Sequence, residues 1–435
     1  MRWLVALCLF VGASTVQADD EEVYPPAGLQ PFLGLDDTSP TTRVGQGRAR
    51  ALQNVTISSS ADLAKRDGLD MIGESLQIPG DALCAVTGLT YAPFAGATAR
   101  IVATCGNRAY YLSGTDWVVI NNFLTAGQNN QVVFTTALSQ LIATNDVEAP
   151  HQWDGGASTG FLPVSFTGLS PTLNAARTAT FFQNYLVFGN TVEGGTRYPT
   201  RIRWSNVGTI NTYTNADYVD VDAPAGQELN CMAQLFGDVY LGFTRSLYRM
   251  SLVGGSGTFA FTKVSNEAGC VAKNSIQQVT LRSQQTGLIF LDGKKNVYFF
   301  NGVTPMTVDE WIRGTMDGVS SSRLPYAVSA ADGEHYRLCL TNGGSSSNDL
   351  CLGYNYLLGE WDEKTVYTGL TGMNAMAPVI DASSVARVYL GTGDSFVYQI
   401  DGTELDNDVG GGSGVLDAVN RIVTTTASSL QVLYD

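Results

Sequence analysis

Two runs near the middle of the chain show the pattern that decides the fold: Arg201-Ile202-Arg203-Trp204-Ser205-Asn206 and Asp238-Val239-Tyr240-Leu241-Gly242-Phe243. In the second run, apolar residues recur at every second position, as in a strand with one or both faces covered. Gly, Asp, Asn and Thr separate such runs over residues 201–252, and we find no group there that is suited to catalysis. The pattern predicts a β scaffold built from repeated units.

The same strand–turn–strand cadence recurs along the chain at starts that are 40, 44, 54, 49, 49 and 51 residues apart. A period of this length made of short strands is typical of β-propeller blades. A four-stranded unit has two apolar faces, and it can bury both only if neighbours stack until a ring closes. The starts are residues 100–104, 140–144, 184–188, 238–241, 287–291, 336–340 and 387–390.

The sequence therefore predicts an all-β protein, a β-propeller of about seven blades with an extended N-terminal arm. We expect the arm and a first strand at residues 19–83 and the propeller at 84–402. A C-terminal loop and closing strands at 403–435 would complete the first blade or extend towards a neighbouring subunit. One weak helical segment is expected at Thr307–Ile312, because Asp309 and Glu310 favour a helix start.

The N-terminus has the pattern of a secretory signal at residues 1–18. A charged start precedes an apolar core, Trp3–Ala13, which is too short to span a bilayer as a helix, and Val16 and Ala18 have cleavage-site spacing. A buried N-terminal strand or helix is the alternative. Leucine precedes Cys8 where a lipoprotein signal needs a small residue, and no other stretch reaches the length of a membrane span.

Composition favours a turn-rich β protein and argues against nucleic-acid binding. The 435 residues include 47 Gly, 10% aromatic residues and 15% charged residues, which excludes disorder as the general state. The formal net charge is −15 and no dense Lys/Arg run occurs, so we do not expect phosphate neutralisation. An acidic surface that lined a pore would repel DNA.

The cysteines fall into sequence-local pairs once Cys8 is removed with the signal. In the last pair, two Leu-Cys-Leu runs flank a polar loop, so a hairpin would place the two sulfurs opposite each other. Disulfides would require an oxidising compartment, in agreement with the signal, and isolated buried thiols are the alternative. The spacings and the two histidines do not suit a zinc site, and we expect no cofactor. The pairs are Cys84 with Cys105, Cys231 with Cys270, and Cys339 with Cys351.

Four further segments follow one another along the chain: Phe32–Gly68, Asn145–Gly155, Arg201–Gly208 and Gly269–Ile276. The ordered set resembles the β-propeller tail proteins of short-tailed bacteriophages and their prophage relatives, which are nozzle, tail-tube and packaged-DNA stabilisation proteins. The resemblance covers residues 28 to 402. It implies a virion structural protein of the tail, without catalysis, that forms a ring continuing the portal channel.

Such a ring holds packaged DNA and conducts it on ejection without binding it specifically. The resemblance also implies a homo-oligomer whose neighbours are the portal, adaptor and tail fibre proteins. Two features depart from the family, since a secretory signal is unusual for a virion protein and the part after Asp401 is short. The alternative is a secreted or periplasmic propeller that binds glycan or protein, which the signal and the paired cysteines favour.

The segment Pro31–Pro40 is polar, extended and outside the blade period, so we expect it to dock onto a partner. The residues expected to carry this docking are Phe32, Leu35, Asp36, Ser39 and Pro40.

Patterns for catalysis and ligand binding are weak. His151 and His335, the two histidines, each lie in a turn context, and no GxSxG, HExxH or P-loop pattern occurs. An acidic segment at residues 401–408 could hold Ca²⁺, but it lacks EF-hand spacing and is better explained as a solvated turn. Carboxylate doublets could serve glycoside hydrolysis, although turn chemistry explains them better, and tryptophans could stack on sugars, although blade packing is their commoner use. These residues are Asp36/Asp37, Asp220/Asp222 and Glu360/Asp362, and Trp117, Trp153, Trp204 and Trp361.

Overall fold

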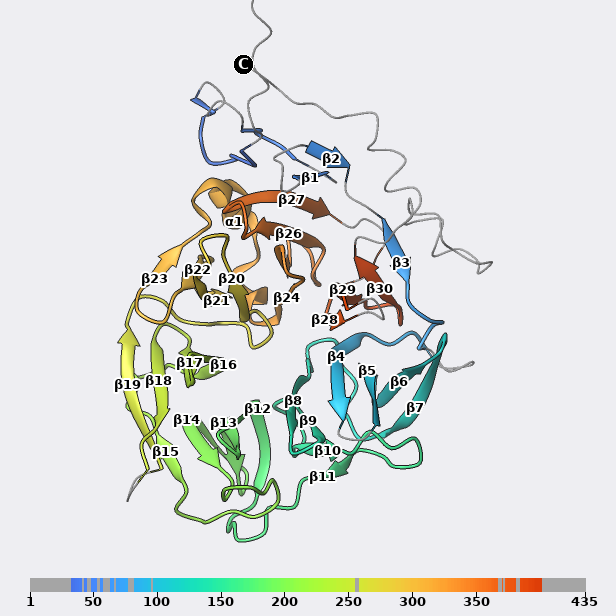
Figure 1. Cartoon of the computed structure of the whole chain (residues 1–435), viewed down its shortest axis with the longest axis vertical. Coiled ribbons are helices and arrows are strands. Elements are labelled where there is room, and N and C mark those ends of the chain that lie inside the picture. The colour runs from blue at the N-terminus through green and yellow to red at the C-terminus, as the bar shows by residue number, and fades with distance from the viewer. Residues whose placement is uncertain are drawn as a thin grey trace, which may run out of the picture.

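The protein is a seven-bladed β-propeller (Figure 1). Its computed structural model contains seven four-stranded antiparallel sheets arranged around an axis, together with the two-stranded hairpin of β1 (Val55–Ile57) and β2 (Leu63–Lys65). The all-β propeller predicted from the sequence is confirmed. The structure describes residues 33–40, 43–44, 48–52, 55–57, 63–65, 68–76, 82–94, 97–254, 258–366, 370, 372–380 and 384–400, so the segments 1–18 and 403–435 lie outside it.

Each blade consists of four strands, and the first strand of each is the innermost (Figure 1). Blade 1 contains β4 (Val86–Phe94), β5 (Ala97–Cys105), β6 (Arg108–Ser113) and β7 (Asp116–Asn122). Blade 2 contains β8 (Val133–Ala137), β9 (Gln140–Thr144), β10 (His151–Trp153) and β11 (Leu162–Pro163). Blade 3 contains β12 (Leu173–Phe182), β13 (Tyr185–Glu193), β14 (Thr196–Trp204) and β15 (Tyr218–Asp220). Blade 4 contains β16 (Leu229–Leu235), β17 (Asp238–Phe243), β18 (Leu247–Leu252) and β19 (Phe259–Ser265).

The remaining blades follow the same plan. Blade 5 contains β20 (Gln277–Thr280), β21 (Thr286–Leu291), β22 (Val297–Phe300) and β23 (Pro305–Thr307). Blade 6 contains β24 (Val328–Ala331), β25 (His335–Leu340), β26 (Leu350–Asn355) and β27 (Glu360–Val366). Blade 7 contains β28 (Ala375–Ile380), β29 (Ala386–Gly391), β30 (Val397–Ile400) and β3 (Leu69–Met71).

The seven repeat starts predicted from the sequence all fall on the second strand of a blade, from β5 to β29. This strand is buried on both faces because it lies between two strands of its own sheet and between two neighbouring blades. All six residues of β25 are buried, and five of the six in β17 and in β21. A strand buried on both faces reads as a continuous apolar run, which explains why its signal is the clearest in each repeat.

The ring is closed by the N-terminal strand β3, which pairs antiparallel with β30 in blade 7. Leu69 lies opposite Ile400, and the backbone N–H of Ile72 donates to the carbonyl of Val397 at 2.8 Å. The propeller therefore begins earlier than the boundary expected at residue 84. Pairing the two ends of the chain in one sheet makes the ring continuous without a covalent link.

The described part of the N-terminal arm packs on the propeller itself. Leu35 is 1% exposed, and its N–H donates to the carbonyl of Trp361 at 2.9 Å, while Asp36 is also buried. This corrects the expectation of a polar docking arm for Leu35 and Asp36, because the chain's own blade 6 covers them. Ser39 is partly buried and Pro40 is exposed, so their docking role stays a prediction, and Phe32 lies outside the described residues.

Three disulfides join the cysteine pairs expected from the sequence. Cys84 is bonded to Cys105, Cys231 to Cys270, and Cys339 to Cys351. Cys339 and Cys351 are direct register partners on β25 and β26, as the hairpin prediction required. Disulfides of this kind indicate an extracellular or otherwise oxidising environment.

The helices that are fully described lie in the connection between blades 5 and 6. They are η2 (Glu310–Ile312), α1 (Arg313–Gly318) and η3 (Ser321–Tyr326), so the expected helical segment begins at Glu310, after strand β23. None of the helices in the described part of the chain has the length and apolar character that a bilayer crossing needs.

The antiparallel topology gives the ring two different ends. Connections between blades and connections between the second and third strands of a blade lie at one end, which we call the cavity end. The turns between the first and second strands and between the third and fourth strands lie at the other, which we call the turn end. The cavity end carries the candidate functional site.

Candidate functional site

A cavity of about 480 Å³ opens at the cavity end of the ring axis. Its walls come from connections that precede β8, β16, β20 and β24, from the β9–β10 and β17–β18 connections, and from the strands β12 and β16 themselves. Residues from five consecutive blades or their connections thus meet in one place because the innermost strands converge on the axis (Figure 1). The lining residues are Asn129, Asn130, Asn145, Asp146, Val147, Arg177, Glu228, Asn230, Thr244, Val271, Lys273, Pro325 and Tyr326.

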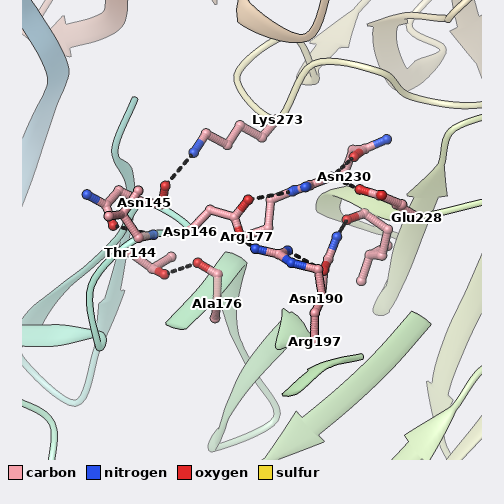
Figure 2. A network of polar contacts seen from close by, with 12 residues as sticks. Thr144, Asn145, Asp146, Ala176, Arg177, Asn190, Arg197, Glu228, Asn230 and Lys273 are labelled. Carbon is pink, nitrogen blue, oxygen red and sulfur yellow. Dashed lines mark hydrogen bonds and ion pairs between the residues drawn. The ribbon is translucent and has the colours of Figure 1, made fainter. Parts of the chain in front are cut away.

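Asp146 is the centre of the polar network that borders this cavity (Figure 2). It follows β9 and has a positive φ of 76°, and its backbone N–H donates to the carbonyl of Ala176 on the innermost strand of blade 3. Its carboxylate accepts hydrogen bonds from Arg177 Nε at 3.1 Å and from Arg197 Nη2 at 2.7 Å. One carboxylate from blade 2 therefore holds two arginines of blade 3.

Arg177 also reaches blade 4. Its Nη1 donates to Glu228 Oε2 at 2.5 Å and to Asn230 Oδ1 at 2.7 Å (Figure 2). The guanidinium groups of Arg177 and Arg197 thus balance the two carboxylates of Asp146 and Glu228. These ion pairs tie three neighbouring blades together at the rim of the cavity.

Lys273 is the third cation of the network and the one without a carboxylate of its own. Its Nζ donates to the backbone carbonyl of Asn145 at 3.3 Å, across the cavity from blade 5 to blade 2 (Figure 2). Burial lowers the pKa of this ammonium to about 8, which the attraction of Asp146 does not offset and the repulsion of Arg177 and Arg197 reinforces.

A second cavity of about 330 Å³ adjoins the first along the ring axis and shares Lys273. It lies between six of the seven innermost strands or the residues preceding them. Its polar lining consists of amides and hydroxyls such as Gln234, Gln277 and Gln278, and apart from Lys273 no charged side chain lines it. The axial space therefore carries its charge at the cavity end.

The two histidines have packing and structural roles. His151 begins β10 and packs against Phe123 with tilted rings whose centroids are 4.7 Å apart, and burial lowers its pKa. The expectation that His335 lies in a turn is wrong, because it begins β25 and is buried. Its Nε2 lies 2.8 Å from Asp362 Oδ2, and although burial opposes its charge, the hydrogen bond to Asp362 raises its pKa.

The three carboxylate doublets do not meet in one site. Each of the six residues contacts a different structural partner. Asp36 accepts the N–H groups of Thr38 and Ser39, Asp220 pairs with Arg201, and Glu360 pairs with Arg48. Asp37 contacts Thr315, Asp362 contacts His335, and the carbonyl of Asp222 accepts from Tyr248.

Tryptophan side chains pack within and between blades, as expected. Trp153, Trp204 and Trp361 are 0%, 5% and 1% exposed, and the partly buried Trp117 donates from Nε1 to the carbonyl of Ile72. The acidic segment 401–408 lies outside the described residues. Within the described ranges, no three or more metal-binding side chains lie close enough together to hold a metal ion.

The residues of the cavity were not predicted from the sequence as a group. Asp146 and Lys273 lie inside two of the segments that carry the resemblance, but nothing local marks them as neighbours. Arg177 and Glu228 lie outside those segments. A usable signal was the rarity of lysine and arginine, 25 in 435 residues, which makes each internal cation of a strand connection informative.

The fold assignment rests on the topology of the chain and not on comparisons with known proteins. No family model matches the chain, and no curated protein matches it. A solved structure titled "Structure of U3-55K" is similar with a TM-score of 0.49 and 10% sequence identity, and the match covers 77% of this chain and 98% of that chain.

Proposed function

We propose that the protein is a structural component of a phage or prophage tail, a subunit of a ring that seals and conducts packaged DNA. The observation that carries this proposal is an apolar surface on turns of blades 4 and 5 at the turn end. Phe236 is 66% exposed and Val303 is 76% exposed, on turns of the neighbouring blades 4 and 5. Exposed apolar surface of this kind marks sites of protein association.

Phe236 and Val303 belong to one surface. The Phe236 ring lies against Gly302, the residue before Val303, and Tyr240 Oη donates to the Gly302 carbonyl at 3.3 Å. Further exposed apolar side chains extend the turn end around the ring, whereas the described connections of the cavity end contribute Leu83 and Val147. These further residues are Leu138, Val207, Leu252, Val253, Ile380 and Val385.

The partner that fits this end is an adjacent tail protein with an apolar surface. The turns at Val253 and Val303 contain no charged residue among the described positions. Asp238, two residues after Phe236, lies 3.7 Å from Arg249. A weakly charged face gains little from a charged partner and gains most from burying apolar area. The ordered tail-protein segments of the sequence support the same assignment.

Purified particles test the proposal. Peptides of this chain should be found by mass spectrometry in particles of the phage that encodes it, and antibody labelling should place them at the tail. The double variant Phe236→Ser/Val303→Ser should lower incorporation by roughly tenfold, whereas Val147→Ser at the cavity end should be incorporated normally. Finding the chain in the medium or periplasm, and never on particles, would overturn the proposal.

The second candidate is a secreted or periplasmic propeller that binds glycan or protein. The three disulfides favour it, because they require an oxidising compartment. The mature N-terminus distinguishes the two. Processing after Ala18 in the periplasm, with no particle association, would support this candidate over the first.

A further inference from the structure

The described charges of the ion cluster beside the axial cavity do not balance one another. Asp146 and Glu228 supply two carboxylates, and Arg177 and Arg197 supply the two guanidinium groups that bind them. Lys273 adds a third positive charge, and the contact printed in Figure 2 for its ammonium is a carbonyl, which carries no full charge. The ion cluster of Asp146, Glu228, Arg177, Arg197 and Lys273 therefore has one more cation than it has carboxylates, in a chain whose net charge is −15.

The described residues also use only part of the hydrogen-bonding capacity of Lys273. An ammonium has three donors, and one of them reaches Asn145 over a long 3.3 Å. Groups that face it are Asp146 from the β9–β10 connection, Arg177 from β12, Arg197 from β14 and Glu228 before β16. Both carboxylates among them are engaged by arginines, so an anion from outside the chain is the partner that the site lacks.

A fourth cation strengthens the positive character of the rim. Arg323 donates from Nη1 to Asn129 Oδ1 at 2.7 Å and stacks on Tyr326 at 4.4 Å, and both of these residues line the cavity. Its Nε and Nη2 are buried without a hydrogen-bond partner among the described residues. Buried cationic donors without partners raise the potential that an anion would meet.

The rest of the lining suits hydroxyl groups. Asn129, Asn130, Asn230 and Thr244 place amides and a hydroxyl around the same space, beside the apolar side chains of Val147 and Val271. A volume of about 480 Å³ lies within the range of small-molecule sites and exceeds what an inorganic ion needs. A ligand that fills it carries both a negative group and several hydrogen-bonding groups.

We propose that the axial cavity binds a small hydroxylated carboxylate, the chemistry of a sugar acid. The carboxylate lies against the ammonium of Lys273, and the hydroxyl groups lie against the asparagine amides of the rim. The inference goes beyond the tail function, since it uses the cavity end whereas assembly uses the turn end. Lys273→Met particles should assemble normally, so the two proposals fail separately.

Calorimetric titration of the full chain with sodium glucuronate as the probe tests the proposal. We expect binding on the order of millimolar, with glucose, the neutral sugar of the same size, binding at least tenfold more weakly. Lys273→Met should weaken glucuronate binding by about tenfold or more, because it removes a charge-assisted hydrogen bond. The exposed Lys294→Met is the matched control and should bind as the unsubstituted protein does.

The pH dependence provides a readout that a purely structural lysine would not give. Glucuronate binding should weaken as the pH rises through the pKa of Lys273, about 8, and binding above that pH should take up a proton. Lys273→Arg should retain glucuronate binding at high pH, because the guanidinium stays charged there. Retained binding would also show that the cavity of this variant is folded. Equal binding by Lys273→Met, equal binding of glucose, or no binding at tens of millimolar glucuronate would each overturn the proposal.

Discussion

Strand β14 carries three arginines into two ion clusters that differ in one respect, whether the chain itself balances their charge. Arg197, near its start, belongs to the open cluster around Asp146 at the cavity. Arg201 and Arg203, near its end, belong to a closed cluster around Glu193 and Asp220. The closed cluster has two cations and two carboxylates, and the open one has three cations and two carboxylates.

The closed cluster is satisfied internally. Glu193 and Arg203 are each 2% exposed, and Glu193 accepts from Arg203 at 2.7 and 2.8 Å and from Arg201 at 3.0 Å. Tyr218 stacks on both guanidinium groups, at 4.0 and 4.9 Å. Although burial opposes its charge, the hydrogen bonds and charge of Arg203 hold the pKa of Glu193 below its ordinary value.

Charge balance therefore distinguishes a structural ion cluster from a candidate binding site that shares a strand with it. A cluster whose charges cancel and whose hydrogen-bond donors all have partners offers no group that could bind a ligand. A cluster that leaves an ammonium poorly partnered beside a cavity is stabilised by a ligand.

The largest expected effect is at the closed cluster. Glu193→Ala leaves Arg201 and Arg203 buried with one remaining carboxylate, and it should lower the free energy of unfolding by about 3–5 kcal/mol. Urea unfolding followed by circular dichroism measures this. The exposed Glu267→Ala serves as the control and should change stability by less than about 0.5 kcal/mol. A loss at Glu193 no larger than the control's would mean that the cluster is not structural.

Acid should weaken the closed cluster next. A carboxyl group whose folded pKa is depressed contributes stability that is present above its unfolded pKa and is lost as the pH falls through the folded pKa. Unfolding free energies measured below the ordinary glutamate pKa should therefore decline more steeply for the unsubstituted protein than for Glu193→Gln. Parallel pH profiles of the two proteins would contradict this account of Glu193.

Removing the central carboxylate of the open cluster should cost less. Asp146, Arg177 and Arg197 have side chains that are 20%, 22% and 36% exposed, so water screens their attraction. We expect Asp146→Ala to lower the free energy of unfolding by about 1 kcal/mol. A loss as large as that of Glu193→Ala, measured under the same conditions, would erase the distinction between the clusters.

The smallest expected effect on stability is that of Lys273→Met. An ammonium whose folded pKa is lowered disfavours the folded state at neutral pH, so its removal should leave the unfolding free energy unchanged or raise it by up to about 1 kcal/mol. Thermal unfolding at pH 7 measures this. A clear loss of stability would show that Lys273 is a structural cation like Arg203.

The ring could be predicted from the sequence because each blade has a local signal, the apolar run of its second strand. Every repeat start marks a strand buried on both faces, and burial of that kind requires a continuous apolar run. Closure by β3 could not be predicted in the same way. Leu69–Met71 is three residues long, and its partner β30 lies more than 300 residues away.

The candidate site was not predictable from local patterns for the same reason. Asp146, Arg177, Glu228 and Lys273 come from separate blades or connections, and they meet only because the ring closes. The closed cluster does have a local signal in the sequence, because Arg201 and Arg203 lie two residues apart on one face of a strand. A strand with two buried cations on one face needs a carboxylate opposite, and Glu193 on β13 supplies it.

The pKa of the Lys273 ammonium in the free protein tests the central claim most directly. It can be followed by nuclear magnetic resonance of ¹³C- and ¹⁵N-labelled lysine side chains, with Lys273→Met to assign the signal. A value of about 8 is predicted, because burial disfavours the charged ammonium and the carboxylates of the described cluster are held by arginines. A value near the ordinary 10.5 would contradict the account, since the chain would then already compensate this cation.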